Sequence, residues 1–145
     1  MSGIGGRVFE SRVLVQWADV DMAGVMYFAA YQRAVERAEM DFFRELGFPY
    51  NEVFEKYDVW FPRVHVVADY FKPAKMEDWL DLKTRIYHVG TSSVKWKTVM
   101  HNERLDETGA QMDVTVVCID RASLKSRPLP QDIRDALMAC LEEVD

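Results

Sequence analysis

One long amphipathic segment, followed by a change in the spacing of apolar residues, constrains this fold more than any other feature. Between Ala29 and Leu46 the apolar residues recur at intervals of three and four, which predicts a helix of about four to five turns. Gly47 and Pro49 should end this helix, because glycine suits a left-handed C-terminal residue and proline does not easily continue a helix. After a short helical turn over residues 50–57, the apolar residues alternate instead. One long helix must therefore cover whatever sheet follows.

The alternating segments predict β-strands that are buried on one face. One strand precedes the long helix and four follow it, before a final short helix: the predicted strands are residues 7–17, 63–70, 80–86, 94–100 and 112–118, and the final helix is residues 132–144. Short, turn-rich connectors join the last four strands, so neighbouring strands are expected to be antiparallel. The prediction is an α+β fold in which a curved five-stranded antiparallel sheet wraps around a long central helix.

The other face of such a sheet lacks a covering helix. Alternation leaves this face partly apolar, and an uncovered apolar surface favours assembly through symmetric contacts. A homodimer is therefore expected. With 145 residues, the chain is long enough for a single domain, residues 1–145, and too short for a catalytic and a regulatory domain together.

The charge and the cysteines restrict partners and location. The chain carries 18 Lys and Arg against 24 Asp and Glu, a formal charge of −6, which argues against a broad nucleic-acid-binding surface. Cys118 and Cys140 are neither spaced as a redox pair nor numerous enough for a disulfide framework, as expected in a reducing compartment. There is no signal-peptide pattern, and no run approaches the roughly 18 apolar residues of a membrane span. We therefore expect a cytoplasmic protein that does not span a membrane.

Several common catalytic and metal-binding motifs are missing from the sequence. It contains no glycine-rich phosphate loop between a strand and a helix, no G-x-S-x-G nucleophile elbow and no paired-cysteine metal motif. The three histidines, His65, His88 and His101, are scattered over predicted strands without the spacing of metal ligands. No metal site is therefore predicted, and nucleotide hydrolysis and serine hydrolysis are disfavoured.

The most informative segment joins the first strand to the long helix. It contains Asp19, Asp21 and Gly24. Turn formation alone accounts for these residue types, because aspartate bonds nearby backbone and glycine permits unusual dihedral angles. A second interpretation is catalytic: a carboxylate just before a helix lies near the free N–H groups and positive dipole of that terminus, and the same N–H groups could polarise a substrate carbonyl. The residues alone leave both interpretations open.

The pattern in this segment resembles that of a known enzyme family. The motif D-x-D-x-x-G-V-x-Y-x-x-x-Y, from Asp19 to Tyr31, is similar to that of the hot-dog-fold acyl-CoA thioesterases, particularly the 4-hydroxybenzoyl-CoA thioesterase and Tol-Pal-associated types. The resemblance covers nearly the whole chain, including the segments KPAKMEDWLDL, HVGTSS and SLKSRPLP. It implies a hot-dog fold and a homodimer in which two sheets pair edge to edge, with a homotetramer as the larger alternative.

The resemblance also implies roles for individual residues. Asp21 matches the catalytic carboxylate, which attacks the thioester carbonyl or activates water for that attack. Phe28 matches the residue whose backbone N–H polarises the carbonyl, a role open to any residue except proline. Substrate binding is implied for residues at and around the helix start: Gly24, Tyr27, Phe28, Tyr31 and Glu36. For Tyr31 and Glu36 a purely structural role is the alternative. No cofactor is implied beyond the coenzyme A of the substrate.

Two positions depart from the family pattern. Phe28 stands where many Tol-Pal-type relatives carry histidine, and Ala30 stands where relatives often carry asparagine or another polar residue. Loss of the histidine weakens the case for a side chain that positions water. The aromatic residues Tyr27, Phe28 and Tyr31 make the entrance apolar, which favours an aromatic or longer acyl group.

A basic segment is the candidate site for the phosphates of coenzyme A. Arg121, Lys125 and Arg127 follow one another without an intervening acid in a chain that is acidic elsewhere. Such a segment is often only a solvated surface. Here it precedes the last helix, where an adenosine phosphate could be held, and we predict that it binds coenzyme A. Lys95 and Lys97, on a predicted strand, are alternatives.

The expected activity is hydrolysis of an acyl-CoA thioester to free acid and coenzyme A, with Asp21 as nucleophile or general base. Two alternatives stay open. The substrate could be a thioester of acyl carrier protein, or the chain could be a non-catalytic hot-dog domain that binds acyl thioesters or a protein partner. The departures at Phe28 and Ala30 motivate the non-catalytic alternative.

Overall fold

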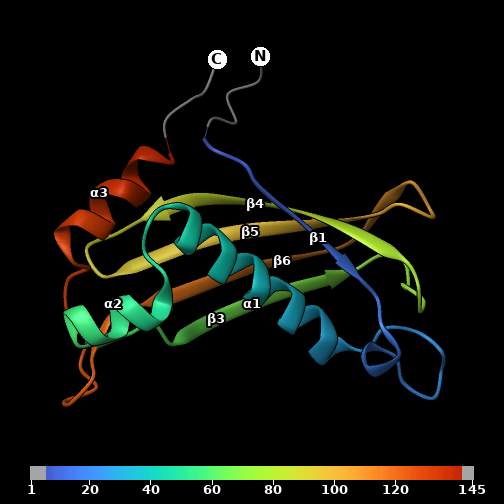
Figure 1. The fold of residues 1–145 in the computed structure, drawn as a ribbon, viewed down its shortest axis with the longest axis horizontal. Helices are drawn as coiled ribbons and strands as arrows, with labels where there is room; N and C mark the ends of the chain where they lie inside the picture. The colour runs from blue at the N-terminus through green and yellow to red at the C-terminus, as the bar shows by residue number, and fades with distance from the viewer. Residues whose placement is uncertain (1–5, 142–145) are drawn as a thin grey trace.

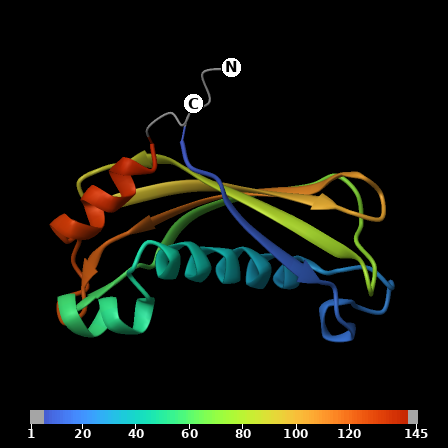
Figure 2. The ribbon, with the colours of Figure 1, turned by 45° about the horizontal axis from the view of Figure 1, so that its top comes forward.

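The predicted long helix packs into the concave face of a curved sheet. A computed structural model describes residues 6–141, and Figures 1 and 2 show the helix lying across the inner face of the sheet. In chain order the elements are β1 (Phe9–Leu14), a 3₁₀ helix η1 (Trp17–Asp19), α1 (Phe28–Glu45), α2 (Tyr50–Tyr57), β2 (Val59–Trp60), β3 (Arg63–Tyr70), β4 (Trp79–Val89), β5 (Ser93–Asn102), β6 (Glu107–Val117), β7 (Ile119–Asp120) and α3 (Gln131–Ala139). The predicted α+β fold is confirmed.

The five long strands form one antiparallel sheet. Their order is β1-β4-β5-β6-β3, so β1 and β3 are the two edges. The predicted antiparallel pairing of successive strands β4, β5 and β6 is confirmed. The expected pairing of β3 with β4 is wrong, because β4 pairs with β1 and β5, and β3 pairs with β6. The short strands β2 and β7 pair with each other, and they lie with α2 at the C-terminal end of α1 (Figure 1).

The core lies between α1 and the inner face of the central strands. Every second residue of β5 is buried, and Trp96 is completely buried with its ring 5.3 Å from that of Phe42 on α1. Ala30, Ala34 and Ala38 are buried on α1, and these small side chains allow the sheet to approach the helix closely. Since burying one large apolar side chain contributes about 1.5–3 kcal/mol, the alternation fixes which face of each central strand points inward.

β1 is shorter than predicted. The predicted strand extended to Trp17, whereas β1 ends at Leu14. The next residue, Val15, bonds to the connector between β3 and β4: its N–H donates to the carbonyl of Asp78 (2.8 Å), and its carbonyl accepts from the N–H of Glu77 (2.8 Å). The chain then turns into η1, where Trp17 is 83% exposed. Trp17 is therefore not part of the strand that was predicted to include it.

β3 was predicted to be buried on one face, and this prediction is wrong. Nearly all of its residues are exposed. It pairs with β6 on one side only, and α1 packs chiefly against β1 and β4, so neither a strand nor the helix covers β3 fully. The exposed apolar residues on this strand and just beyond it, here called the β3 edge, are Val64, Val66, Val67, Tyr70 and Phe71.

The outer face of the sheet was predicted to be partly apolar, and it is instead chiefly charged. Neighbouring strands place Arg12 beside Asp81 and Asp81 beside His101. Asp81 lies 3.8 Å from both of these side chains, and Lys83 lies 3.8 Å from Glu10 across the same pair of strands. The apolar surface available for a symmetric contact is therefore at the β3 edge.

The C-terminal helix is also shorter than predicted. α3 spans Gln131–Ala139, and the part of the predicted helix after residue 141 lies outside the described residues. No helix within residues 6–141 is long and apolar enough to cross a membrane. The cytoplasmic location stays a prediction.

Glu39 is a fully buried acid in the C-terminal half of α1. Its carboxylate accepts hydrogen bonds from the Tyr50 hydroxyl and the Arg63 guanidinium, which joins α1 to α2 and to the start of β3. Burial raises the pKa of Glu39 to about 7, although Arg63 and the Tyr50 hydroxyl both act to lower it. The folded protein therefore holds a proton here at pH values where the unfolded chain has released it.

We predict that Glu39 makes the fold less stable as the pH rises from about 4.5 to about 7. Over that range the folded state binds more protons than the unfolded state, so this residue lowers the free energy of unfolding by roughly 2 kcal/mol. The glutamine of Glu39→Gln cannot titrate, so this variant should lose this part of the pH dependence of the free energy of unfolding. Urea unfolding of the wild type, Glu39→Gln and the control Asp41→Asn, which changes a less buried acid of α1, at pH 5 and pH 7 measures the effect. A difference between wild type and Glu39→Gln that is the same at both pH values would contradict the assignment.

Candidate active site

The segment between η1 and α1 folds into a tight loop that carries Asp21. Val20 and Met26 form an antiparallel bridge, which closes residues 20–26, here called the Asp21 loop. Inside it the Asp21 carbonyl accepts from the N–H of Gly24 (2.9 Å), and Gly24 has a φ of +79°, where glycine is favoured. The Asp21 side chain is exposed, and its Oδ1 accepts from the N–H of Ala23 (2.9 Å). Asp21 therefore helps to form the turn and also keeps its carboxylate accessible to solvent.

The N-terminus of α1 lies at the same end of the molecule as this loop (Figure 1). Tyr27 is the N-cap residue, and its side chain makes no capping hydrogen bond. The first N–H groups of a helix, starting here at Phe28, have no acceptor within the helix and carry the positive end of the helix dipole. The Asp21 loop thus brings an exposed carboxylate to the end of α1 where backbone donors are available.

The connector between β3 and β4 holds this arrangement in place. The carbonyl of Ala74 accepts from the N–H of Met26 (2.8 Å) at the end of the Asp21 loop. Asp78, which is almost completely buried, accepts from Arg104 (2.6 Å), the side chain of Asn102 (3.0 Å) and the N–H of Lys75 (2.9 Å). The Arg104 hydrogen bond is the largest cause that lowers the pKa of Asp78 to about 2.

Sequence reasoning did not identify Asp78 as a supporting residue. It lies in a turn-rich connector directly before a strand, where an acid is ordinarily solvent-exposed. Its partner Asn102 is the last residue of β5, and Arg104 lies in the turn between β5 and β6. Nothing in the local sequence indicates these contacts.

An apolar pocket of about 260 Å³ opens beside the start of α1. Its lining comes from the helix start and from the end of β3: Met26, Phe28, Tyr31, Tyr70, Phe71, Lys72 and Pro73. Tyr31 is buried, with its ring 5.0 Å from that of Tyr70, so it is both core and pocket wall. Phe28 is 68% exposed at the rim. The largely apolar and aromatic lining of the pocket is suited to contact with an acyl group.

Three of the predicted substrate-binding residues do not line this pocket. Gly24 lies in the Asp21 loop instead. Tyr27 does not line it, and the Tyr27 hydroxyl accepts instead from Arg33 (3.3 Å). Glu36 is exposed on α1, about 12 Å along the helix axis from Phe28. A role for Glu36 in substrate binding stays a prediction.

The basic segment is not brought to the Asp21 loop within one chain. α1 has 18 residues and is about 27 Å long, and the basic segment lies near the opposite end of it, beside α2. Arg121 donates to the carbonyl of Phe54 (2.8 Å), and Arg127 donates to that of Tyr57 (3.2 Å).

Acids from outside the basic segment also approach its arginines. Arg121 lies 3.3 Å from Glu55, and Arg127 lies 3.4 Å from Asp120. Lys125 is exposed, and no ion pair to it occurs among residues 6–141. The positive charge here is therefore more compensated than the sequence indicated.

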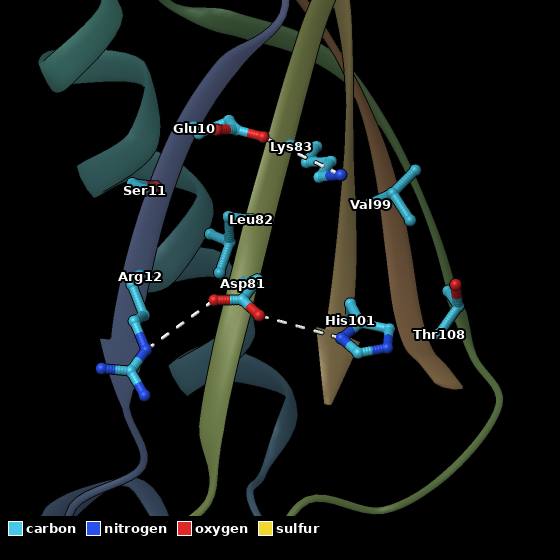
Figure 3. A pocket seen from close by; sticks show the side chains of 9 residues that line it. All are labelled: Glu10, Ser11, Arg12, Asp81, Leu82, Lys83, Val99, His101 and Thr108. Atoms are coloured by element: carbon cyan, nitrogen blue, oxygen red, sulfur yellow. Dashed lines mark ion pairs between the residues drawn. The ribbon is translucent and has the colours of Figure 1, made fainter. Parts of the chain in front are cut away.

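A larger pocket, of about 750 Å³, lies on the outer face of the sheet (Figure 3). Its cations already have acidic partners: Arg12 binds both carboxylate oxygens of Glu103 (2.7 and 2.9 Å), and Lys83 lies 3.8 Å from Glu10. It shares no residue with the Asp21 loop or the apolar pocket. We therefore place the candidate site at the Asp21 loop.

We predict that Asp78→Ala destabilises the fold by about 2–3 kcal/mol, because it leaves the buried Asn102 amide and the Arg104 guanidinium without their acceptor. Urea unfolding at pH 7 measures the loss. Since the pKa of Asp78 is lowered, its contribution is present at neutral pH and disappears as the pH falls through about 2. Glu10→Ala, which removes an exposed acid on β1, is the control. Equal stability of the two variants would contradict the bracing role.

Two bacterial proteins that are named as acyl-CoA thioesterases resemble the chain over most of its length. It is 32% identical over 129 residues to the acyl-CoA thioester hydrolase YbgC of Escherichia coli O157:H7, covering 87% of this chain and 92% of that protein. It is 29% identical over 131 residues to the acyl-CoA thioesterase YbgC of Haemophilus influenzae, covering 88% of this chain and 93% of that protein.

Solved structures share the fold, and a family model matches the sequence. The 1,4-dihydroxy-2-naphthoyl-CoA thioesterase Slr0204 from Synechocystis has a TM-score of 0.84 at 24% identity, covering 91% of this chain and 96% of that one. A thioesterase superfamily protein from Jannaschia sp. CCS1 has a TM-score of 0.85 at 22% identity, covering 97% and 98%. The family model described as the thioesterase-like superfamily matches residues 15–137. The chain therefore belongs to the thioesterase-like superfamily and is a hot-dog-fold enzyme of that family.

Proposed function

We propose that this enzyme hydrolyses acyl-CoA thioesters to a free acid and coenzyme A, with Asp21 as the essential carboxylate. The observation that carries the proposal is the Asp21 loop, which presents an exposed carboxylate at the uncapped N-terminus of α1 next to an apolar pocket. The named activities of the two YbgC relatives support the choice of an acyl-CoA thioester as substrate.

The chemistry needs few groups. A thioester carbonyl is more electrophilic than that of an oxygen ester, and its thiolate is a good leaving group. Backbone N–H groups at the start of α1 stabilise the oxyanion that forms when the carbonyl is attacked, so the Phe28 side chain does not affect this step. Asp21 either takes a proton from the attacking water or attacks directly to form an anhydride that water then hydrolyses. Both routes release the thiol and the acid and return Asp21 to its starting state.

The coenzyme A part of the site is proposed to require a second copy of the chain. The β3 edge is an unpaired strand edge with exposed apolar residues, and such an edge is stable when another strand pairs with it. Antiparallel pairing of two β3 strands about a two-fold axis places the Tyr70 end of one strand beside the Arg63 end of the other. The second copy's basic segment then lies at the same end as the first copy's Asp21 loop.

We predict that Asp21→Asn lowers kcat for acyl-CoA hydrolysis by about 10²–10⁴-fold, because asparagine can neither attack nor accept a proton. Thiol release from aromatic, short-chain and long-chain acyl-CoA esters measures the activity, and circular dichroism checks that the variant is folded. Asp41→Asn, at a half-buried position near the other end of α1, is the matched control.

Three outcomes of that assay would overturn part of the proposal. Wild-type rates in Asp21→Asn would remove Asp21 from the reaction. Tight acyl-CoA binding by the wild type without turnover would support the non-catalytic alternative. Faster release from acyl carrier protein thioesters than from coenzyme A thioesters would change the carrier.

We predict that the Val64→Lys, Val67→Lys double variant is monomeric and has lost most acyl-CoA hydrolysis, since lysine on an edge strand opposes strand pairing. Sedimentation velocity gives the oligomeric state, and thiol release gives the activity. Val99→Lys, on the outer face, should keep both wild-type properties. A double variant that stays dimeric would show that the β3 edge is not the interface.

A further inference from the structure

Arg33 lies on α1, and its side chain contacts both residues that flank the Asp21 loop. Its guanidinium is 3.5 Å from a carboxylate oxygen of Asp19 and donates to the hydroxyl of Tyr27 (3.3 Å). The same guanidinium lies 5.7 Å from the centre of the Tyr27 ring. Asp19 directly precedes the loop, and Tyr27 directly follows it.

The two flanking residues are also bonded to each other. The N–H of Tyr27 donates to the carbonyl of Asp19 (3.1 Å), so they form the base of the loop. The second oxygen of Asp19 accepts from the N–H of Gln16 (2.8 Å), which fixes the Asp19 side chain. Arg33 is the side chain that attaches this base to the flank of α1.

We propose that Arg33 is a positioning residue, which holds the Asp21 loop in a fixed orientation against the N-terminus of α1 without touching the substrate. This inference rests on the proposed function of Asp21. The side chain of Tyr27, the N-cap residue of α1, makes no capping hydrogen bond to the first turn of the helix, so the orientation of the loop depends on other contacts. A reacting carboxylate displaced by about 1 Å from its productive position loses up to two orders of magnitude in rate.

A phosphate-binding role is the competing explanation for an exposed arginine near an active site. Arg37, one turn further along α1, lines the same small hollow and is exposed. No ion-pair partner of Arg37 occurs among residues 6–141. Arg33 is already engaged by Asp19 and Tyr27, whereas Arg37 makes no such contact with the base of the loop. The chain thus offers Arg37→Ala as a matched control.

Steady-state kinetics of the full-length protein with an acyl-CoA ester test the proposal. Arg33→Ala should lower kcat about tenfold with KM changed less than about twofold, because a displaced carboxylate affects the reaction and not the binding of the substrate. Arg37→Ala should leave kcat unchanged, and Arg33→Lys should recover part of the loss. Arg33→Ala combined with Asp19→Asn should be no worse than Arg33→Ala alone, since the Arg33–Asp19 ion pair is already lost and the asparagine oxygen can still accept from the N–H of Gln16. An effect on KM alone, or a wild-type kcat, would overturn the positioning role.

Amide hydrogen exchange gives a readout that does not depend on activity. The N–H groups of Asp21 and Tyr27 bond within the loop and at its base, and they should exchange about fivefold faster in Arg33→Ala but not in Arg37→Ala. If Asp21→Asn keeps wild-type hydrolysis while exchange changes as expected, the proposed function of Asp21 fails and the loop-holding role stands. Unchanged exchange in Arg33→Ala would overturn that role.

Discussion

The fit of a single helix into the concave face of a single sheet is the constraint on which the rest of this structure depends. α1 packs against the buried face of the central strands, and the alanines along it allow close approach. One helix cannot cover five strands completely, so β3 is left as an exposed apolar edge. The same packing directs the N-terminus of α1 to one end of the sheet, where the connector before β4 holds the Asp21 loop through Met26. The position of the candidate site and the exposure of the candidate interface therefore both follow from the packing of α1 against the sheet.

Two buried acids illustrate how the surroundings of a carboxylate decide its behaviour. Burial dominates at Glu39 and raises its pKa to about 7, in spite of the Arg63 guanidinium. Hydrogen bonds dominate at Asp78, where Arg104, Asn102 and a backbone N–H lower the pKa to about 2. Asp78 therefore stays ionised beside the Asp21 loop at any physiological pH, and the support of the site does not titrate. Glu39, the acid with a pKa of about 7, lies instead where α1 meets α2 and the start of β3.

Periodicity predicts the parts of this fold that depend on local pattern. The spacing between Ala29 and Leu46, with Gly47 after it, locates α1 to within about one residue. The alternation in β5 predicts its buried face correctly. The same kind of alternation fails for β3, because its burial depends on which neighbours lie beside it and not on its own sequence. The predicted extension of the first strand to Trp17 is wrong for a related reason, since β1 is ended by hydrogen bonds to a connector about sixty residues later.

The candidate site shows the same division between local and distant information. The family motif marks Asp21 and Phe28, which are local to one turn. It does not mark Asp78, whose partners Asn102 and Arg104 lie at the end of β5 and just after it. The motif also ends at Tyr31, before Arg33.

Charge counting is limited in the same way. The bases of the basic segment stand together in the sequence, but Glu55 and Asp120 approach Arg121 and Arg127 in space. Their guanidinium groups also donate to backbone carbonyls at the end of α2, so these arginines hold α2 to the chain beyond β7 and retain only part of their charge for an anion. The net charge of −6 therefore neither provides nor excludes a phosphate site. Within one chain, the 18-residue helix α1 separates the basic segment from the Asp21 loop. Whether the basic segment can bind a phosphate of the substrate therefore depends on whether a second chain brings it to the Asp21 loop.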